Sequence, residues 1–228
     1  MSACLAVMGK QPERGKVKTR IAAALGDERA LELYRCTLQD TLELALSIGD
    51  VAHVFSYAPP TEAARRYFKY AAPQFELIPQ QGCGLGECIA NTLASILQSH
   101  SPVVVIGSDS PDMPARLITR AFEILQTSDV VLGPAHDGGY YLIGVRSMQP
   151  VLFERIDWST SVVAQQTRER AIEAGLRVVD LPPWHDLDTV NDLRSLVAPG
   201  APLTRAFVAA LNAKEVHENK SGGCLEGR

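Results

Sequence analysis

The sequence predicts an α/β protein, a three-layer α/β/α sandwich with a mostly parallel sheet. Short runs rich in Val, Ile and Leu alternate with segments of helical periodicity along most of the chain. In addition, residues 103–106 are wholly apolar, as expected of a central parallel strand that is covered on both faces. Strands and helices that alternate at this spacing form such layered sheets.

The individual elements follow from the spacing of their apolar residues. The longest helix, 27–48, places Ala30, Tyr34, Leu38 and Leu42 on one face. A proline begins helix 114–125, where a missing N–H costs nothing. The predicted strands are 3–8, 51–57, 75–79, 103–106, 130–132, 140–143 and 176–181, and the predicted helices are 27–48, 62–70, 85–98, 114–125, 161–174, 188–196 and 203–211.

The domain organisation is predicted to be simple. The 228 residues would accommodate two small domains, but no internal repeat or strong linker divides them, so residues 1–213 are expected to form one domain. Residues 214–228 have no periodic apolar pattern and are predicted to be a mobile tail.

Composition excludes several classes of function. A net charge of -4 argues against general affinity for nucleic acid or an anionic membrane, and no apolar stretch reaches the length of a membrane span. The five cysteines are scattered and contain no C-x-x-C pair, so neither a disulfide framework nor a zinc site is indicated. With no signal-peptide pattern, the expected compartment is the cytoplasm.

Five basic residues and two glycines lie between residues 8 and 20, directly behind the first predicted strand. Backbone N–H groups and positive charge at such a place can hold a phosphate, although the segment matches neither the Walker nor the dinucleotide-binding pattern. The alternative is a solvated surface loop. The candidate phosphate-binding residues are Lys10, Arg14, Gly15, Lys18 and Arg20.

Carboxylates follow two later strands, where ligands bind in open α/β sheets. Asp109 comes after residues 103–106 and would suit Mg²⁺ or Mn²⁺, which take oxygen ligands; a turn residue is the alternative. Asp188 could complete a two-carboxylate metal site or cap the following helix, and Asp186 is a weaker candidate. Asp112, just before Pro114, is expected to be a turn or capping residue.

Two further loops are candidates for substrate contact. Asp137-Gly138-Gly139 is a preferred hairpin connection, but its glycines would also let a ligand approach the backbone. Trp158-Ser159-Thr160 precedes a predicted helix. Ser159 or Thr160 could cap that helix, while Trp158 either walls a pocket or packs in the core.

These motifs, taken in order, resemble a known family. They are Lys10 with Gly15-Lys16-Val17-Lys18-Thr19-Arg20, then Gly107-Ser108-Asp109, Asp137-Gly138-Gly139-Tyr140-Tyr141, Trp158-Ser159-Thr160 and Asp186-Leu187-Asp188-Thr189. The set is similar to a bacterial family of glycosyltransferases, or selenodomain-associated transferases, in the GT-A nucleotide-diphospho-sugar transferase superfamily. The stretch 18–21 and the D-x-D-T motif at residues 186–189 also resemble nucleotidyltransferases, which transfer a guanylyl or cytidylyl group to a small phosphorylated acceptor.

The resemblance implies a role for each motif. Lys10, Lys18 and Arg20 would bind nucleotide phosphates, Asp109 and Asp188 would hold a divalent ion, and the Asp137 loop would face the acceptor or sugar, which makes Lys18, Asp109 and Asp137 the candidate catalytic residues. This chain departs from the family at Gly84 and Cys88, where members often carry an aspartate and a basic residue. The departure puts the specificity in doubt.

Two versions of a metal-dependent transferase remain open. In glycosyl transfer the donor is a nucleotide sugar; in nucleotidyl transfer an acceptor phosphate attacks a nucleoside triphosphate and pyrophosphate leaves. A non-catalytic nucleotide-binding module is the alternative from another class. The expected partners are therefore a nucleoside triphosphate or nucleotide sugar and a small acceptor, and an open sheet edge would allow a homodimer.

Overall fold

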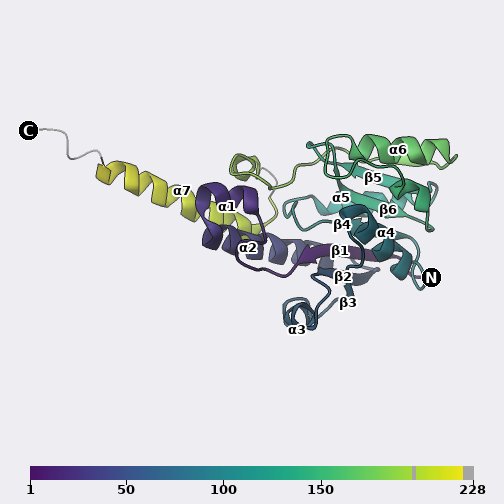
Figure 1. Ribbon diagram of the computed structural model, residues 1–228, viewed down its shortest axis with the longest axis horizontal. Coiled ribbons are helices and arrows are strands. Elements are labelled where there is room, and N and C mark those ends of the chain that lie inside the picture. The colour runs from purple at the N-terminus through teal and green to yellow at the C-terminus, as the bar shows by residue number, and fades with distance from the viewer. Residues whose placement is uncertain (197–198, 223–228) are drawn as a thin grey trace, which may run out of the picture.

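The computed structural model describes residues 1–196 and 199–222, which form a central sheet between two layers of helices (Figure 1). This arrangement confirms the predicted fold class. The strands are β1 (Cys4–Lys10), β2 (Ala52–Ala58), β3 (Glu76–Pro79), β4 (Val103–Ile106), β5 (Val130–Pro134), β6 (Tyr140–Val145) and β7 (Val178–Asp180). The helices are α1 (Thr19–Leu25), α2 (Asp27–Leu46), α3 (Glu62–Ala71), α4 (Leu85–Ile96), α5 (Ala115–Ile124), α6 (Val163–Glu173) and α7 (Pro202–Gly222), with 3₁₀ turns η1 (Pro150–Phe153) and η2 (Asp192–Ser195).

The order of the strands creates an opening in the sheet. The order is β3-β2-β1-β4-β6-β5-β7, and only β6 runs antiparallel to its neighbours. The chain leaves β1 toward β2 and β3, then returns to β4 on the other side, so the order reverses between β1 and β4. Their pairing ends at Val7 and Ile106, whereas β1 continues to Lys10. A crevice opens at such a reversal, at the carboxyl ends of the strands.

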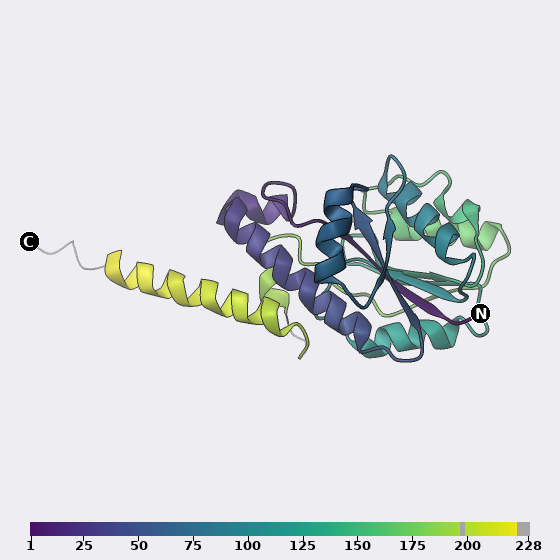
Figure 2. The ribbon, with the colours of Figure 1, turned by 90° about the horizontal axis from the view of Figure 1, so that it is seen from below.

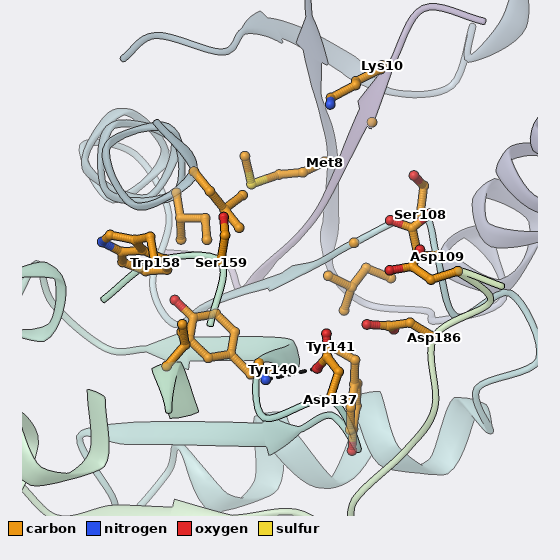
Figure 3. Close-up of a pocket in the computed structure, with 18 of the residues that line it drawn as sticks. Met8, Lys10, Ser108, Asp109, Asp137, Tyr140, Tyr141, Trp158, Ser159 and Asp186 are labelled. Atoms are coloured by element: carbon orange, nitrogen blue, oxygen red, sulfur yellow. Dashed lines mark hydrogen bonds between the residues drawn. The ribbon is translucent and has the colours of Figure 1, made fainter. Parts of the chain in front are cut away.

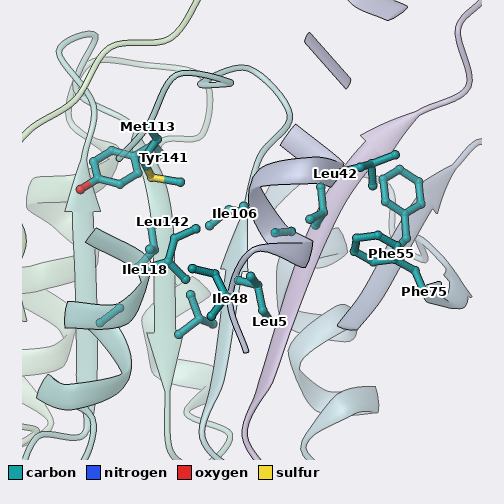
Figure 4. Packing of buried hydrophobic residues seen from close by; sticks show 14 of the residues in the cluster. Leu5, Leu42, Ile48, Phe55, Phe75, Ile106, Met113, Ile118, Tyr141 and Leu142 are labelled. Carbon is teal, nitrogen blue, oxygen red and sulfur yellow. The ribbon is translucent and has the colours of Figure 1, made fainter. Parts of the chain in front are cut away.

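Alternate side chains of the strands enter two separate cores. One face, with Leu5 and Ile106, packs against α2, α3 and α5 (Figure 4). The other face, with Ala6 and Val105, packs against α4 and α6. Because β4 is buried on both faces, its sequence has no polar alternation, as predicted.

A smaller core joins α1, α2 and η2 to the first part of α7. The buried carboxylate of Asp40 on α2 accepts hydrogen bonds from the backbone N–H groups of Leu203 and Thr204 and from the Thr204 hydroxyl, at 3.1, 2.8 and 2.6 Å. Asp40 therefore caps α7 from another helix, a role that the sequence of α7 alone does not reveal. Beyond these contacts α7 extends away from the sheet (Figure 2).

Several predicted boundaries were wrong. Helix α1 was not predicted, because it buries only Ile21, too little to produce a periodic pattern. The helix predicted at 188–196 is only the turn η2, because the Asp192 carboxylate accepts hydrogen bonds from the backbone N–H groups of Asp188 and Thr189 and holds that segment as a loop. The helix predicted to end at residue 211 continues to Gly222 and so includes residues 214–222 of the predicted tail. The rest of that tail, residues 223–228, lies outside the described residues.

Candidate functional site

A pocket of about 650 Å³ opens at the crevice between β1 and β4. Segments far apart in the sequence line it: the end of β1, residues 16–20, the residues after β4, the β5–β6 turn, the loop before α6, and residues 186 and 188. Figure 3 shows the carboxylates of Asp109, Asp137 and Asp186 pointing into one part of the pocket, with Trp158 and Tyr140 on the opposite side. The pocket therefore has an acidic part and an aromatic part.

Lys18 lies at the centre of the acidic part. Its Nζ contacts Asp109 Oδ1 at 2.5 Å and the carbonyl oxygen of Leu187 at 2.6 Å, and lies 3.6 Å from Asp188 Oδ1. The side chain is 3% exposed. Burial lowers the pKa of Lys18, but the charge and hydrogen bond of Asp109 and the charge of Asp188 outweigh it, so the pKa is raised and the ammonium stays charged.

The backbone at Lys18 is unusual. Lys18 has φ 47° and ψ 43°, the left-handed conformation, at the residue that precedes α1. Non-glycine residues adopt this conformation at a cost of about 1 kcal/mol or more, and such residues cluster at functional sites. The conformation sends the side chain into the crevice, where it links the β1–α1 segment to Asp109 after β4 and to Leu187. The Leu187 N–H in turn donates a hydrogen bond to the Asp109 carbonyl at 2.8 Å.

The pKa values of two neighbouring carboxylates, Asp186 and Asp188, are raised. Burial raises the pKa of Asp186 to about 6, nearby carboxylates add to this, and the hydrogen bond from Ser110 opposes it. Burial also raises the pKa of Asp188, while the Lys18 ammonium lowers it. A cluster of carboxylates that raise one another's pKa favours the binding of a cation.

Tyr34 fixes the end of β1. Its hydroxyl accepts a hydrogen bond from the Lys10 N–H at 2.8 Å and donates one to the Lys10 carbonyl at 3.0 Å. The hydroxyl takes the place of a strand partner, because β4 has already ended at Ile106. The sequence placed Tyr34 on the buried face of α2, but nothing in that pattern indicates a contact with β1.

The hairpin predicted at Asp137-Gly138-Gly139 joins β5 to β6. Asp137 Oδ1 accepts from the Gly139 N–H at 2.9 Å. Gly138 has φ 92°, and a Cβ there would lie 2.0 Å from the Ser161 carbonyl oxygen, so only glycine fits. Gly138 thus secures the turn to the loop before α6, and Asp137 and Gly139 face the pocket.

The aromatic part depends on a second glycine. Trp158 packs directly over Gly86 in α4, where a Cβ would lie 2.2 Å from the indole ring. The Tyr140 ring meets Trp158 edge-on at 6.4 Å between ring centroids. Trp158 therefore forms a wall of the pocket and also packs against α4. Neither Ser159 nor Thr160 caps α6, whose N-cap Val162 has no side-chain capping bond.

The structure brings most of the predicted site residues together. Around the pocket lie Lys10, Lys18, Arg20, Asp109, Asp137, Gly139, Trp158, Ser159, Thr160 and Asp188. Arg14, Gly15 and Gly138 do not line it. Arg14 instead pairs with Glu28 at 3.0 Å on the surface. Four residues that were not among the candidates also line the pocket: Lys16, Gln80, Leu85 and Tyr140.

Asp112 lies in a turn, as predicted, closed by the hydrogen bond from the Met113 N–H to the Ser110 carbonyl at 3.1 Å, but it does not cap α5. It is fully buried, with Oδ1 3.3 Å from both the Trp184 Nε1 and the His185 Nε2 atoms, and Oδ2 has no hydrogen-bond partner among the described residues. Asp112 thus supports the segment that leads to Asp186, instead of capping α5.

The residues fit a divalent ion of the kind that the family resemblance implies. Asp109 and Asp188 are half exposed toward the pocket and lie within 4 Å of the same ammonium. Within residues 1–196 and 199–222, no three His, Cys, Asp or Glu side chains are grouped as a metal cage. Two carboxylates completed by water and substrate phosphates are the usual ligands of Mg²⁺, which seldom uses an all-protein cage.

Comparisons with known proteins identify the family of this chain and several of its relatives. Residues 41–160 match the family DUF2064, described as an uncharacterized protein conserved in bacteria. A proposed nucleotide-diphospho-sugar transferase from Desulfovibrio desulfuricans G20 is 36% identical, with a TM-score of 0.83 over 92% of this chain and 98% of that one. A 3-phospho-D-glycerate guanylyltransferase from Phenylobacterium zucineum (strain HLK1) is 28% identical over 72% of this chain and 79% of its own.

More distant structures share the fold alone. The inositol-1-phosphate CTP transferase from T. maritima is 12% identical with a TM-score of 0.58, over 90% of this chain and 95% of that one. The fold and pocket define a transferase of the GT-A type, the class of nucleotide-diphospho-sugar transferases and nucleotidyltransferases. Within that class the chain belongs to the DUF2064 family. Among the described residues, no helix is both long and apolar enough to cross a membrane.

Proposed function

We propose that this chain is a metal-dependent nucleotidyltransferase, which joins a nucleoside triphosphate to a small phosphorylated acceptor. The observation that carries the proposal is the convergence of Lys10, Lys16 and Arg20 with Asp109 and Asp188 on one pocket. Polyphosphate needs positive charge along its length, and two carboxylates beside it suit the accompanying ion. The guanylyltransferase from Phenylobacterium zucineum supports this reading.

The proposed roles follow the two parts of the pocket. Lys10, Lys16 and Arg20 bind the triphosphate, and Asp109 and Asp188 hold Mg²⁺ or Mn²⁺. A bound divalent ion would offset the charge that develops on the leaving phosphates. An oxygen of the acceptor phosphate attacks the α-phosphorus, the bond from that phosphorus to the bridging oxygen breaks, and pyrophosphate leaves. Asp137, in the β5–β6 turn, faces the acceptor.

Glycosyl transfer from a nucleotide sugar is the second candidate. The 36% identity to the Desulfovibrio desulfuricans protein favours it. In that reaction the Asp137 carboxylate would serve as the acceptor-side base. The cytoplasmic location and a homodimer through the β3 or β7 edge also remain predictions.

A panel of nucleoside triphosphates and nucleotide sugars, each with EDTA, Mg²⁺ or Mn²⁺, tests the proposal by thermal shift. A metal-dependent rise in Tm with one triphosphate and no sugar nucleotide, followed by pyrophosphate release with phosphorylated acceptors, is the expected result. Asp109→Asn and Asp188→Asn should abolish the metal-dependent shift, whereas Glu123→Gln on the outer face of α5 should not. A shift with nucleotide sugars alone would favour glycosyl transfer. Binding that persists without metal and in both Asn variants would indicate a binding module.

A further inference from the structure

The Lys18 ammonium is held by protein oxygens in this structure. Two protein oxygens lie at 2.5 and 2.6 Å from Nζ and a third lies at 3.6 Å, and the side chain is 3% exposed. An ammonium has three N–H donors; the two closer oxygens accept hydrogen bonds from it, and Asp188 Oδ1 lies at ion-pair distance. By contrast, Lys16 reaches the same pocket from the surface, with its side chain 71% exposed.

The oxygens that surround Lys18 are those of a cation site. Asp109 and Asp188 are the two carboxylates to which the proposed function assigns the divalent ion. The negative charge of Asp186 also stabilises the Lys18 ammonium. Arg20 also faces Asp188, at 3.7 Å, but its side chain is 74% exposed and water screens its charge. Lys18 is therefore the buried positive charge between the two aspartates.

We propose that the Lys18 ammonium is a stand-in cation, which occupies the Asp109–Asp188 site until a divalent ion replaces it. The inference rests on the proposed function, because that function supplies the ion. Without a cation, two adjacent carboxylates in a partly buried site repel each other and destabilise the fold. With the ammonium in place their charge is partly neutralised, but an arriving divalent ion meets a like charge.

Loss of the ammonium should therefore have two opposite effects. The metal-free protein should become less stable, because the carboxylates are left unpaired. The same change should strengthen the binding of a divalent ion, because the competing charge is gone. A lysine that binds phosphate directly would produce neither effect, and its loss would weaken nucleotide binding instead.

The test compares Lys18→Met with Lys16→Met, which removes an exposed lysine from the same pocket. The measurements are Tm in EDTA and Mn²⁺ affinity by calorimetry, without nucleotide. For Lys18→Met we expect a Tm at least about 5 °C lower in EDTA, Mn²⁺ affinity raised by about tenfold or more, and recovery of the lost Tm with Mn²⁺. Lys16→Met should match the natural protein in each. Unchanged or weaker Mn²⁺ binding by Lys18→Met would overturn the proposal.

A second variant covers a failure of Lys18→Met to fold. Asp109→Asn and the double variant Lys18→Met/Asp109→Asn complete a thermodynamic cycle in EDTA. If the Lys18 ammonium pairs with the Asp109 carboxylate, the double variant should fold and be more stable than Lys18→Met alone. The proposal is contradicted if the double variant also fails to fold, or if it is as unstable as Lys18→Met. This cycle needs no ligand. Absence of any nucleotide-dependent metal shift in the natural protein would instead count against the proposed function.

Discussion

Replacement of Tyr34 by phenylalanine isolates the hydroxyl that holds the end of β1. The ring remains in the core, and the hydroxyl's two hydrogen bonds to the Lys10 N–H and carbonyl are lost. Each such bond contributes about 0.5–1.5 kcal/mol, so the free energy of unfolding should fall by about 2 kcal/mol. For a chain of this size that corresponds to a Tm lower by about 4–8 °C.

The functional effect should exceed the effect on stability. Release of the Lys10 backbone loosens one of the lysines proposed to bind phosphate, so the KM for the nucleotide should rise several-fold while kcat changes less. Urea unfolding and initial-rate kinetics check both effects, with Tyr67→Phe as a control on a half-buried tyrosine of α3 that does not line the pocket. If Tyr34→Phe unfolds within 0.5 kcal/mol of the natural protein, the hydroxyl does not hold β1 and the reasoning is wrong.

Three other changes test the described geometry. Gly138→Ala should destabilise the protein by about 3 kcal/mol or more in urea unfolding, because a Cβ there meets a backbone oxygen at 2.0 Å, whereas Gly84→Ala, with open space around it, should be almost neutral. Asp40→Ala should cost about 2 kcal/mol and selectively increase hydrogen exchange at the start of α7, since its cap is lost; uniform exchange would argue against this role. In EDTA, the Asp186 carboxylate has a pKa of about 6 when folded against an ordinary value of 3.8, so its deprotonation lowers stability as the pH rises from about 4 to 6. Asp186→Asn should remove that loss and gain up to about 3 kcal/mol above pH 7, and an unchanged pH profile would contradict it.

The sheet could be predicted from the sequence, and most of the candidate site residues do lie around the pocket, because both follow from local patterns. Apolar runs define β1 and β4, and the residues that follow such strands meet at one edge. The roles that depend on long-range contacts could not be predicted. Nothing near Asp40 in the sequence indicates that it caps α7, and nothing near Tyr34 indicates that it bonds to Lys10. The burial of Lys18 among carboxylates is of the same kind.

The errors in the basic segment have a related cause. Arg14 and Lys18 are both basic residues of the same charged segment. The left-handed backbone at residue 18 directs the Lys18 side chain inward, whereas the Arg14 side chain remains at the surface. Composition indicates how much positive charge follows β1. It does not indicate which of those charges is buried, because that depends on the direction of each Cα–Cβ bond.

The one antiparallel strand has a consequence for how this site can change. In a fully parallel sheet, every residue at the ligand edge comes from the carboxyl end of a strand and leads into a long crossover. Because β6 runs the other way, its first residue, Tyr140, and the five-residue connection before it lie at that edge. A tight turn can be altered by single substitutions without rerouting a helix. Substitutions at residues 137 and 139 would therefore change this side of the pocket and leave the ends of β1 and β4 in place.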